Sequence, residues 1–346
     1  MLYQPVIIRD IRQVVSGFSI FTFEEGHDIP YAAGQYLTFV HDTSYEELRR
    51  SYSILSAPLL HEPLAIGVRR IDNGAFSRWL SDSAAPGSRL LTTGAAGFFT
   101  LPDNIDAYRQ VFFLAAGSGI TPIYSLLKAL LHGHPGVQAA LVYSNPSPAH
   151  TILYEELQAL ALNFGDRFQI RFIFSNDPQL ARAHLNREYL VQLLDEYLTV
   201  SPQEALFYTC GPEAYMRMCT YTLHEEGVPP QQIRREHFFT EKRIVTHPPI
   251  DETPRHVLIR YDGVEHVFTV NYPDTILQAA KKAGIRLPYS CEAGRCGSCA
   301  ARCISGRVWL SYNEVLTETE LRQGLTLTCV GHPAGGDVVL SLDALP

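Results

Sequence analysis

CEAGRCGSC, residues 291–299, places three cysteines in one short loop, and a fourth cysteine, Cys329, follows at the end of the apolar stretch LTLTC. Two irons require four thiolates, and one tight loop together with a distant strand end can supply them. Gly294 and Gly297 allow the loop backbone to curl, so that amide N–H groups can point at the sulfurs. The spacing therefore predicts a 2Fe-2S cluster ligated by Cys291, Cys296, Cys299 and Cys329.

A zinc site and a disulfide framework fit these cysteines less well. A structural zinc site usually pairs two CxxC or HxxxH units, whereas the distal partner here is a lone cysteine. A disulfide framework is unusual in a long chain without a secretory signal, and the chain holds an odd number of cysteines, seven. Of the three other cysteines, we interpret Cys219 and Cys303 as small buried residues rather than ligands.

The 346-residue chain divides into regions that differ in their pattern of apolar residues. Residues 1–104 carry short alternating apolar stretches broken by glycine and proline, which predicts an antiparallel β-barrel. Residues 105–240 alternate apolar strands with helix-forming segments, which predicts an α/β domain with a parallel sheet and helices on both of its faces. The sequence therefore predicts a multidomain protein.

The C-terminal part begins after residues 241–254, which hold three prolines and are interpreted as a semi-rigid linker. In residues 255–346 we expect a hairpin with Asp262-Gly263 at its turn, and then a helix that Asp274 caps and Gly284 ends. This order of strands, helix and cysteine loop resembles the plant-type ferredoxins. The resemblance implies an α+β fold of the β-grasp type that carries one electron at a time.

RSYSILS, residues 50–56, resembles the R-x-Y-S motif of the ferredoxin–NADP reductase superfamily, and AGQY (33–36) precedes it as in that family. The resemblance implies that Arg50 binds the pyrophosphate of FAD, for which its planar fork is suited. It also implies that Tyr52 lies against the isoalloxazine and that the Ser53 hydroxyl lies near flavin N5, the atom that accepts hydride. Taken alone, so short a motif also fits an exposed arginine beside a strand.

A second segment, GVRRIDNGAFSRWL (67–80), resembles the family's other flavin-binding stretch. We expect Asn73, Gly74, Ala75, Phe76 and Ser77 to begin a helix whose unpaired N–H groups meet the second phosphate. GFFTL (97–101) resembles the strand that closes the barrel. These segments favour FAD over the FMN of the phthalate dioxygenase reductase branch.

LAAGSGITPIYSLL (114–127) carries the nicotinamide motif. Gly117 and Gly119 lie between a buried strand and a helix, where glycines let the backbone approach a pyrophosphate. Pro122 replaces the third glycine of the Rossmann fingerprint and is tolerated in the first helical turn, so the pattern with Thr121 is G-x-G-x-T-P, as in the reductase superfamily.

YTCGPEAYM (208–216) is the second nicotinamide segment. In the family, the counterparts of Cys210, Gly211 and Pro212 lie beside the nicotinamide ring and the flavin. A buried strand-end cysteine is the alternative. REHFF (235–239) resembles the segment that ends this domain, so Glu236 and Phe238 are expected to approach the flavin.

The choice between NADH and NADPH depends on the group that meets the ribose 2′ position. Relatives often carry an arginine after the strand-end asparagine, but here Asn145 is followed by Pro146 and Ser147. The missing arginine favours NADH, although a basic side chain elsewhere would substitute: His150, Arg182 or Arg187.

Composition excludes several other classes of protein. The net charge of −8 and the lack of a basic block argue against nucleic-acid binding. The N-terminus resembles no secretory signal, and no apolar run is long enough to span a membrane, so we expect a cytoplasmic protein. No coiled-coil pattern or apolar interface stripe is present, and we expect a monomer.

Three motif sets occur in the order flavin, nicotinamide, cluster, and they most resemble reductase subunits of the phenylacetyl-CoA epoxidase type. The resemblance implies that electrons pass from NADH or NADPH through FAD and the cluster to a protein acceptor such as an oxygenase, epoxidase or desaturase. Catalysis would involve Ser53, Tyr52 and Cys210. The main alternative is a stand-alone diaphorase that reduces a ferric chelate or another small acceptor; a redox sensor and an oxygenase are disfavoured because no DNA-binding segment or di-iron motif is found.

Overall fold

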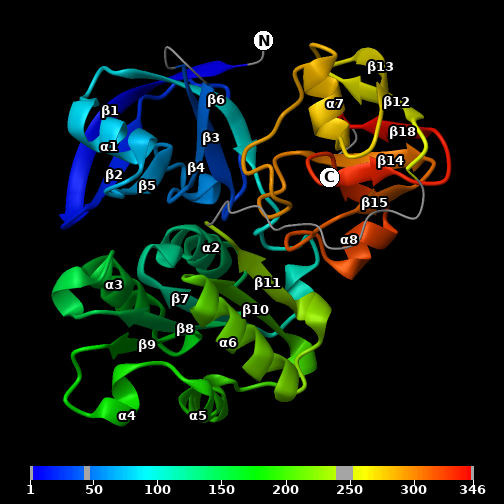
Figure 1. The fold of residues 1–346 in the computed structure, drawn as a ribbon. Coiled ribbons are helices and arrows are strands. Elements are labelled where there is room, and N and C mark those ends of the chain that lie inside the picture. Colours follow the sequence, from blue (N-terminus) through cyan, green and yellow to red (C-terminus); the bar gives the residue numbers. More distant parts are fainter. Residues whose placement is uncertain (1–2, 43–46, 239–251, 344–346) are drawn as a thin grey trace. The chain divides into compact units, whose positions relative to one another are not determined.

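The computed structural model describes residues 3–42, 47–238 and 252–343 (Figure 1). The chain forms two compact units, Met1–Glu236 and His237–Pro346. Most of the expected linker, residues 241–254, lies outside the described residues.

A six-stranded antiparallel sheet forms the first part of the unit Met1–Glu236, in the order β4-β3-β6-β1-β2-β5. An additional bridge pairs Ile54 with Ile66 and joins the end of β4 to β5, so the sheet closes into the predicted barrel. Phe21, Phe23 and Phe39 fill its interior. The strands are β1 (Gln4–Val15), β2 (Phe18–Phe23), β3 (Tyr36–Asp42), β4 (Glu47–Ser53), β5 (Ala65–Arg69) and β6 (Arg89–Ala96), and the helix is α1 (Ala75–Ser83).

A five-stranded parallel sheet forms the rest of this unit, in the order β11-β10-β7-β8-β9. Alternate residues of β7 enter two separate cores: Phe113 packs with residues of α2 and α3, and Phe112 packs with residues of α5 and α6. Helices therefore cover both faces, as predicted. The elements are β7 (Gln110–Ala116), α2 (Ile120–Gly133), β8 (Gln138–Asn145), α3 (Tyr154–Phe164), β9 (Phe168–Phe174), α4 (Leu180–Ala183), α5 (Arg187–Tyr197), β10 (Ala205–Cys210), α6 (Glu213–Glu225) and β11 (Ile233–Glu236).

The segment GFFTL, residues 97–101, is not the expected strand, because β6 already ends at Ala96. Its carbonyl groups bond to side chains instead of to a neighbouring strand: the Tyr208 hydroxyl donates to Thr100 O at 2.7 Å. The Phe99 ring also meets the Tyr208 ring edge to face, with 5.1 Å between centroids. The segment therefore joins the barrel to the parallel sheet.

A five-stranded mixed sheet and a separate two-stranded ribbon form the unit His237–Pro346. The sheet order is β13-β12-β18-β14-β16, in which β12 and β18 run parallel and the other pairs are antiparallel. This arrangement agrees with the expected β-grasp. The elements are β12 (Arg255–Tyr261), β13 (Val264–Val270), α7 (Ile276–Lys282), β14 (Ala300–Ser305), β15 (Val308–Leu310), α8 (Glu318–Arg322), β16 (Leu325–Leu327), β17 (Gly331–Pro333) and β18 (Val338–Ser341).

The turn at Asp262-Gly263 is confirmed, since both residues have positive φ between β12 and β13. The prediction that Asp274 caps α7 is wrong. Thr275 is the N-cap and forms a capping box with Gln278, whose side chain bonds back to the Thr275 N–H. Asp274 instead pairs with Lys282 at 2.6 Å.

Candidate functional site

The end of strand β4 carries the residues of the R-x-Y-S motif. Of two adjacent arginines, Arg49 is buried, and it donates to Glu47 at 2.7 Å and to the Tyr3 hydroxyl at 3.0 Å. Arg50 is exposed, and its Nη1 donates to the carbonyl of Arg49. The fold therefore uses the first guanidinium in the barrel wall and leaves the second at the surface, where an anion can reach it.

Tyr52 lies in an aromatic group that joins the barrel to α1. Its ring centroid is 6.2 Å from that of Phe39 and 6.0 Å from that of Phe76. Burial raises the pKa of the Tyr52 phenol, and the charge of Arg50 opposes part of that rise. The phenol stays neutral, so the ring offers an uncharged aromatic surface.

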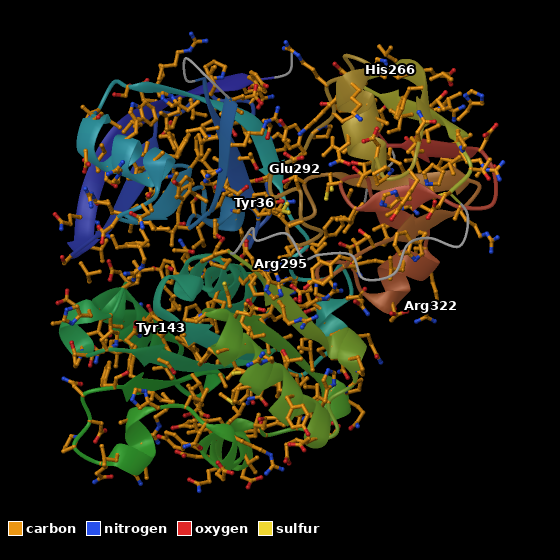
Figure 2. All side chains as sticks on the ribbon, viewed as in Figure 1. Tyr36, Tyr143, His266, Glu292, Arg295 and Arg322 are labelled. Atoms are coloured by element: carbon orange, nitrogen blue, oxygen red, sulfur yellow. The ribbon has the colours of Figure 1, made fainter. Side chains whose placement is uncertain are left out.

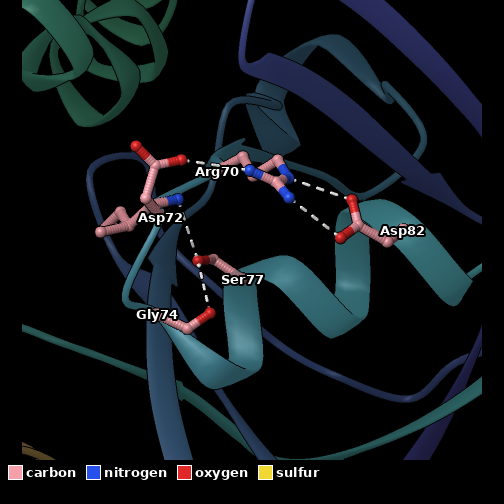
Figure 3. A network of polar contacts seen from close by, with 6 residues as sticks. Arg70, Asp72, Gly74, Ser77 and Asp82 are labelled. Atoms are coloured by element: carbon pink, nitrogen blue, oxygen red, sulfur yellow. Dashed lines mark hydrogen bonds and ion pairs between the residues drawn. The ribbon is translucent and has the colours of Figure 1, made fainter.

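Helix α1 begins at Ala75, one residue after its N-cap Gly74, as the sequence predicted (Figure 3). Ser77 fixes the turn before the helix: its hydroxyl donates to Gly74 O at 3.2 Å and accepts from Ile71 N at 3.1 Å. The Arg70 guanidinium donates hydrogen bonds to both carboxylate oxygens of Asp82, at 3.0 and 3.1 Å. The first turn contains no acidic side chain, which suits a phosphate at this end of the helix.

The two nicotinamide segments meet at the ends of neighbouring strands β7 and β10. A Cβ at Gly119 would lie 2.0 Å from the carbonyl oxygen of Cys210, so only glycine fits there. The Tyr143 hydroxyl supports the turn by donating to Gly117 O at 2.9 Å, and Thr121 Oγ1 donates to Ser118 O at 2.9 Å. Parallel strands that end together at one edge of a sheet are a common place for nucleotides to bind.

Ser53, Cys210 and Glu236 come from distant parts of the sequence and lie together. The Ser53 hydroxyl donates to Glu236 Oε1 at 3.3 Å, and Cys210 is the register partner of Glu236 in the β10–β11 pair. Burial raises the pKa of Glu236 to about 8, and the Ser53 hydrogen bond opposes that rise. Burial, and then the Glu236 charge, also raise the pKa of the Cys210 thiol, so both groups hold their protons at neutral pH.

Glu236 Oε2 is buried without a hydrogen-bond partner among the described residues. An orphaned oxygen is costly unless a ligand or water satisfies it. Together with the exposed Arg50 and the start of α1, this oxygen fits a site for a polar, phosphate-bearing cofactor such as FAD.

The cysteine loop curls as its glycines predicted, with φ of 70° at Gly294 and 86° at Gly297. The thiols of Cys296 and Cys329 hydrogen-bond to the Cys291 sulfur, which lowers the pKa of Cys291. The Cys329 thiol also bonds to that of Cys299, and these bonds raise the Cys329 pKa. All four sulfurs therefore converge, and the fourth cysteine lies in the turn that follows the end of β16.

The convergence fits a two-iron cluster. A backbone amide points at a ligand sulfur, since Ala293 N lies 3.4 Å from Cys291 Sγ. A 2Fe-2S cluster divides its four thiolates between two irons.

Two ion pairs that sequence reasoning missed hold this loop in place, one at Arg295 and one at Glu292, and both of these residues are labelled in Figure 2. Arg295 is 4% exposed and lies 3.0 Å from Glu314. Lys281 of α7 lies 3.0 Å from Glu292 and 3.5 Å from the ring centroid of Tyr289. No sequence signal marks these partners, because each pair joins the loop to a separate segment.

The remaining candidate residues lie elsewhere. Cys219 belongs to α6 and is buried in the core that this helix forms with the parallel sheet. Cys303 is half-buried, with its thiol 3.5 Å from Ser305 O. Among the basic candidates for the ribose, Arg187 pairs with Glu225 at 2.6 Å and His150 Nδ1 lies 2.7 Å from Ser147 Oγ.

The fold and the site define a class of protein, a flavin- and nicotinamide-dependent electron-transfer protein with an iron–sulfur domain. Family models match in the same order: an oxidoreductase FAD-binding domain over residues 5–101, an oxidoreductase NAD-binding domain over 113–220, and a 2Fe-2S iron-sulfur cluster binding domain over 259–334.

Two curated relatives cover nearly the whole chain. The ferredoxin reductase component of 3-ketosteroid-9-alpha-monooxygenase from Mycobacterium tuberculosis is 32% identical over 343 residues, which is 94% of this chain and 91% of the relative. The E subunit of 1,2-phenylacetyl-CoA epoxidase from Escherichia coli is 30% identical over 91% of this chain and 89% of the relative. The chain belongs to this family of FAD- and 2Fe-2S-containing, NAD(P)H-dependent reductase components.

Solved structures agree on the fold. Phthalate dioxygenase reductase superposes with a TM-score of 0.60 at 23% identity and covers 98% of both chains. A self-sufficient cytochrome P450 monooxygenase superposes with a TM-score of 0.75 at 21% identity over 98% of this chain and 41% of that one. Separately, no helix in the described part of the chain is long and apolar enough to cross a membrane.

Proposed function

We propose that hydride transfer takes place where Ser53, Cys210 and Glu236 meet, and that electrons leave through the cluster to a protein acceptor of the oxygenase type. The observation that carries this proposal is the Ser53–Glu236 hydrogen bond of 3.3 Å, which joins the flavin motif to the end of the nucleotide-binding sheet. FAD, when bound, accepts a hydride and releases electrons singly. The protein's contribution is chiefly to hold the reactants in place.

Each motif has a proposed role in that site. Ser53 donates a hydrogen bond close to the reacting flavin atom, and Tyr52 supplies the aromatic surface. The neutral Glu236 orients the Ser53 hydroxyl without placing a charge beside the flavin. The proposed binding residues are Arg50 and Gly74, Ala75, Phe76 and Ser77 for FAD; Gly117, Gly119, Thr121, Pro122, Cys210, Gly211 and Pro212 for the nicotinamide nucleotide; and Cys291, Cys296, Cys299 and Cys329 for the cluster.

NADH is the proposed reductant. Pro146 and Ser147 follow the strand-end Asn145 where a 2′-phosphate would need a basic group. A relative from Escherichia coli, 30% identical over 91% of this chain, is named NADH oxidoreductase. We assign FAD binding to residues 1–104, nucleotide binding to residues 105–240 and the cluster to residues 255–346. We also propose that the protein is cytoplasmic, because NADH is supplied in the cytoplasm.

An anaerobic absorbance titration tests this function, after acid release of the flavin to identify it. We expect FAD, and bleaching of both flavin and iron–sulfur bands at about three electrons per chain, two on the flavin and one on the cluster. NADH should act at lower concentration than NADPH. An iron–sulfur band that stays oxidised while the flavin is reduced would contradict the relay and favour the diaphorase alternative.

A further inference from the structure

Helix α2 lies directly against the barrel, with no room for a methyl group at two positions of contact. A Cβ on Gly67 of β5 would lie 2.6 Å from Thr121 Cγ2. A Cβ on Gly34 would lie 2.8 Å from Leu126 Cδ2. Both distances are shorter than van der Waals contact, so α2 and the barrel pack at the closest approach that their backbones allow.

An ion pair between the buried Lys128 and the half-buried Glu62 joins the middle of α2 to the loop between β4 and β5. Lys128 is 6% exposed, and its ammonium group bonds to Glu62 Oε2. The same oxygen accepts from Ala57 N at 2.9 Å, and Lys128 Nζ lies 4.6 Å from the ring centroid of Tyr124. Removing Glu62 would leave the buried Lys128 ammonium poorly solvated, so the pair resists separation.

A second contact holds the same two segments one helical turn away. Ser125 Oγ donates to Ser56 O at 2.7 Å. Ser56 is itself fixed, because its hydroxyl accepts from Ala65 N at 3.1 Å and from the Tyr31 hydroxyl at 2.9 Å. Ser56 is the last residue of RSYSILS, so α2 is tied directly to the flavin motif.

We propose that Lys128, Glu62 and Ser125 are positioning residues for hydride transfer. They hold α2, whose first turn follows the G-x-G segment, in register with residues 50–56. The inference rests on the proposed function, which places the nicotinamide nucleotide at the first segment and FAD at the second. None of the three residues is assigned to either cofactor. They act only through the distance and angle that they set between the nicotinamide and the flavin.

Stopped-flow reduction of the FAD-loaded protein by NADH tests the proposal, because it separates the limiting rate of flavin reduction from the dissociation constant of NADH. For Lys128→Met and Glu62→Gln we expect the limiting rate to fall about tenfold, since a misplacement of order 1 Å is costly. We expect the dissociation constant to stay within about twofold, because the binding segments are intact. Lys128→Arg keeps the charge and should restore most of the rate.

Arg12→Gln is the matched control. Arg12 of β1 pairs with Glu156 of α3 at 3.0 Å and so crosses the same boundary, but the Arg12 side chain is 56% exposed whereas that of Lys128 is 8% exposed. Solvent screening makes such a pair weak. The Arg12→Gln variant should therefore reduce its flavin at the rate of the unaltered protein.

Wild-type limiting rates in both Lys128→Met and Glu62→Gln, with full FAD content, would overturn the proposal and leave the pair a purely structural role. If either variant fails to retain FAD, Ser125→Ala decides instead, because it removes one hydrogen bond and keeps the ion pair; an unchanged limiting rate there also overturns the proposal. Failure of NADH and NADPH to reduce the unaltered protein would count against the proposed function, not against the positioning network.

Discussion

At the scale of single residues, Glu236 sets the expected pH dependence. Its pKa is raised to about 8 by burial, so the carboxyl is neutral at neutral pH and charged in alkali. A negative charge beside the flavin opposes the arrival of a hydride. We predict that the limiting rate of flavin reduction falls about tenfold from about pH 7 to about pH 9, as a single group that titrates near 8 requires. Stopped-flow measurements across this range give the profile.

Glu236→Gln provides the control, because the amide keeps the shape and cannot ionise. Its rate should be independent of pH over the same range. The variant also tests the linked stability: a raised folded pKa means that the native protein loses stability as pH rises from the ordinary value of 4.5 to about 8. The thermal midpoint of Glu236→Gln, relative to that of the unaltered protein, should therefore rise as pH increases from 4.5 to about 8. A difference between the two midpoints that does not change with pH would contradict the assignment.

Gly119→Ala tests the contact between the two nicotinamide segments. The added methyl carbon would lie 2.0 Å from the carbonyl oxygen of Cys210, so one of the two turns must move. We predict a loss of about 1–3 kcal/mol in stability and NADH binding weakened about tenfold, measured by thermal unfolding and by titration. Gly136→Ala is the control, because no atom lies within 4 Å of its Cβ position; an equal effect at both positions would argue against a specific clash.

At the scale of elements, the capping box of α7 is the clearest test of a local rule. Thr275→Ala removes the side-chain oxygen that accepts from Gln278 N, and should cost about 1 kcal/mol. Asp274→Ala breaks only the surface pair with Lys282 and should cost less than about 0.5 kcal/mol. Urea unfolding followed by the iron–sulfur absorbance reports on this unit. The reverse order of the two losses would show that Asp274 is the effective cap.

At the scale of the whole molecule, Cys329→Ser separates the two halves of the relay. The change removes one of the four converging thiols and should abolish the iron–sulfur absorbance. Reduction of ferricyanide by NADH, which needs only the flavin, should stay within about twofold. Reduction of cytochrome c should fall by at least about tenfold if one-electron acceptors are served by the cluster. Undiminished cytochrome c reduction would mean that electrons leave from the flavin.

The elements that the sequence predicted well are those with a local cause. The strand VFFLAA is apolar throughout because both faces of β7 are covered, and the glycines of the cysteine loop have the positive φ that their positions required. Such features depend on residues close in sequence, so a single chain reveals them.

The features that the sequence did not predict depend on partners far apart. Glu62 and Lys128 each resemble an ordinary surface charge in the sequence, and only the fold brings them together and buries Lys128. The pair Arg295 and Glu314 is similar. The cap at Thr275 is an exception, because Thr275 and Gln278 have the T-x-x-Q spacing of a capping box in the sequence itself, whereas Asp274 has no such partner.

The close packing at Gly67 limits how this family can be recombined. The Thr121 methyl leaves no space for a β-carbon on that glycine, and Ser56 and Glu62 bond to α2 from the same side. A chimera made by exchanging residues 105–238 for those of a relative would contain a counterpart of α2 whose side chains pack against a different barrel surface. The unit that can be transplanted is therefore the nucleotide-binding part together with the barrel segment 50–67. A crossover point belongs before the flavin motif, at about residue 50, rather than at the apparent boundary near residue 104.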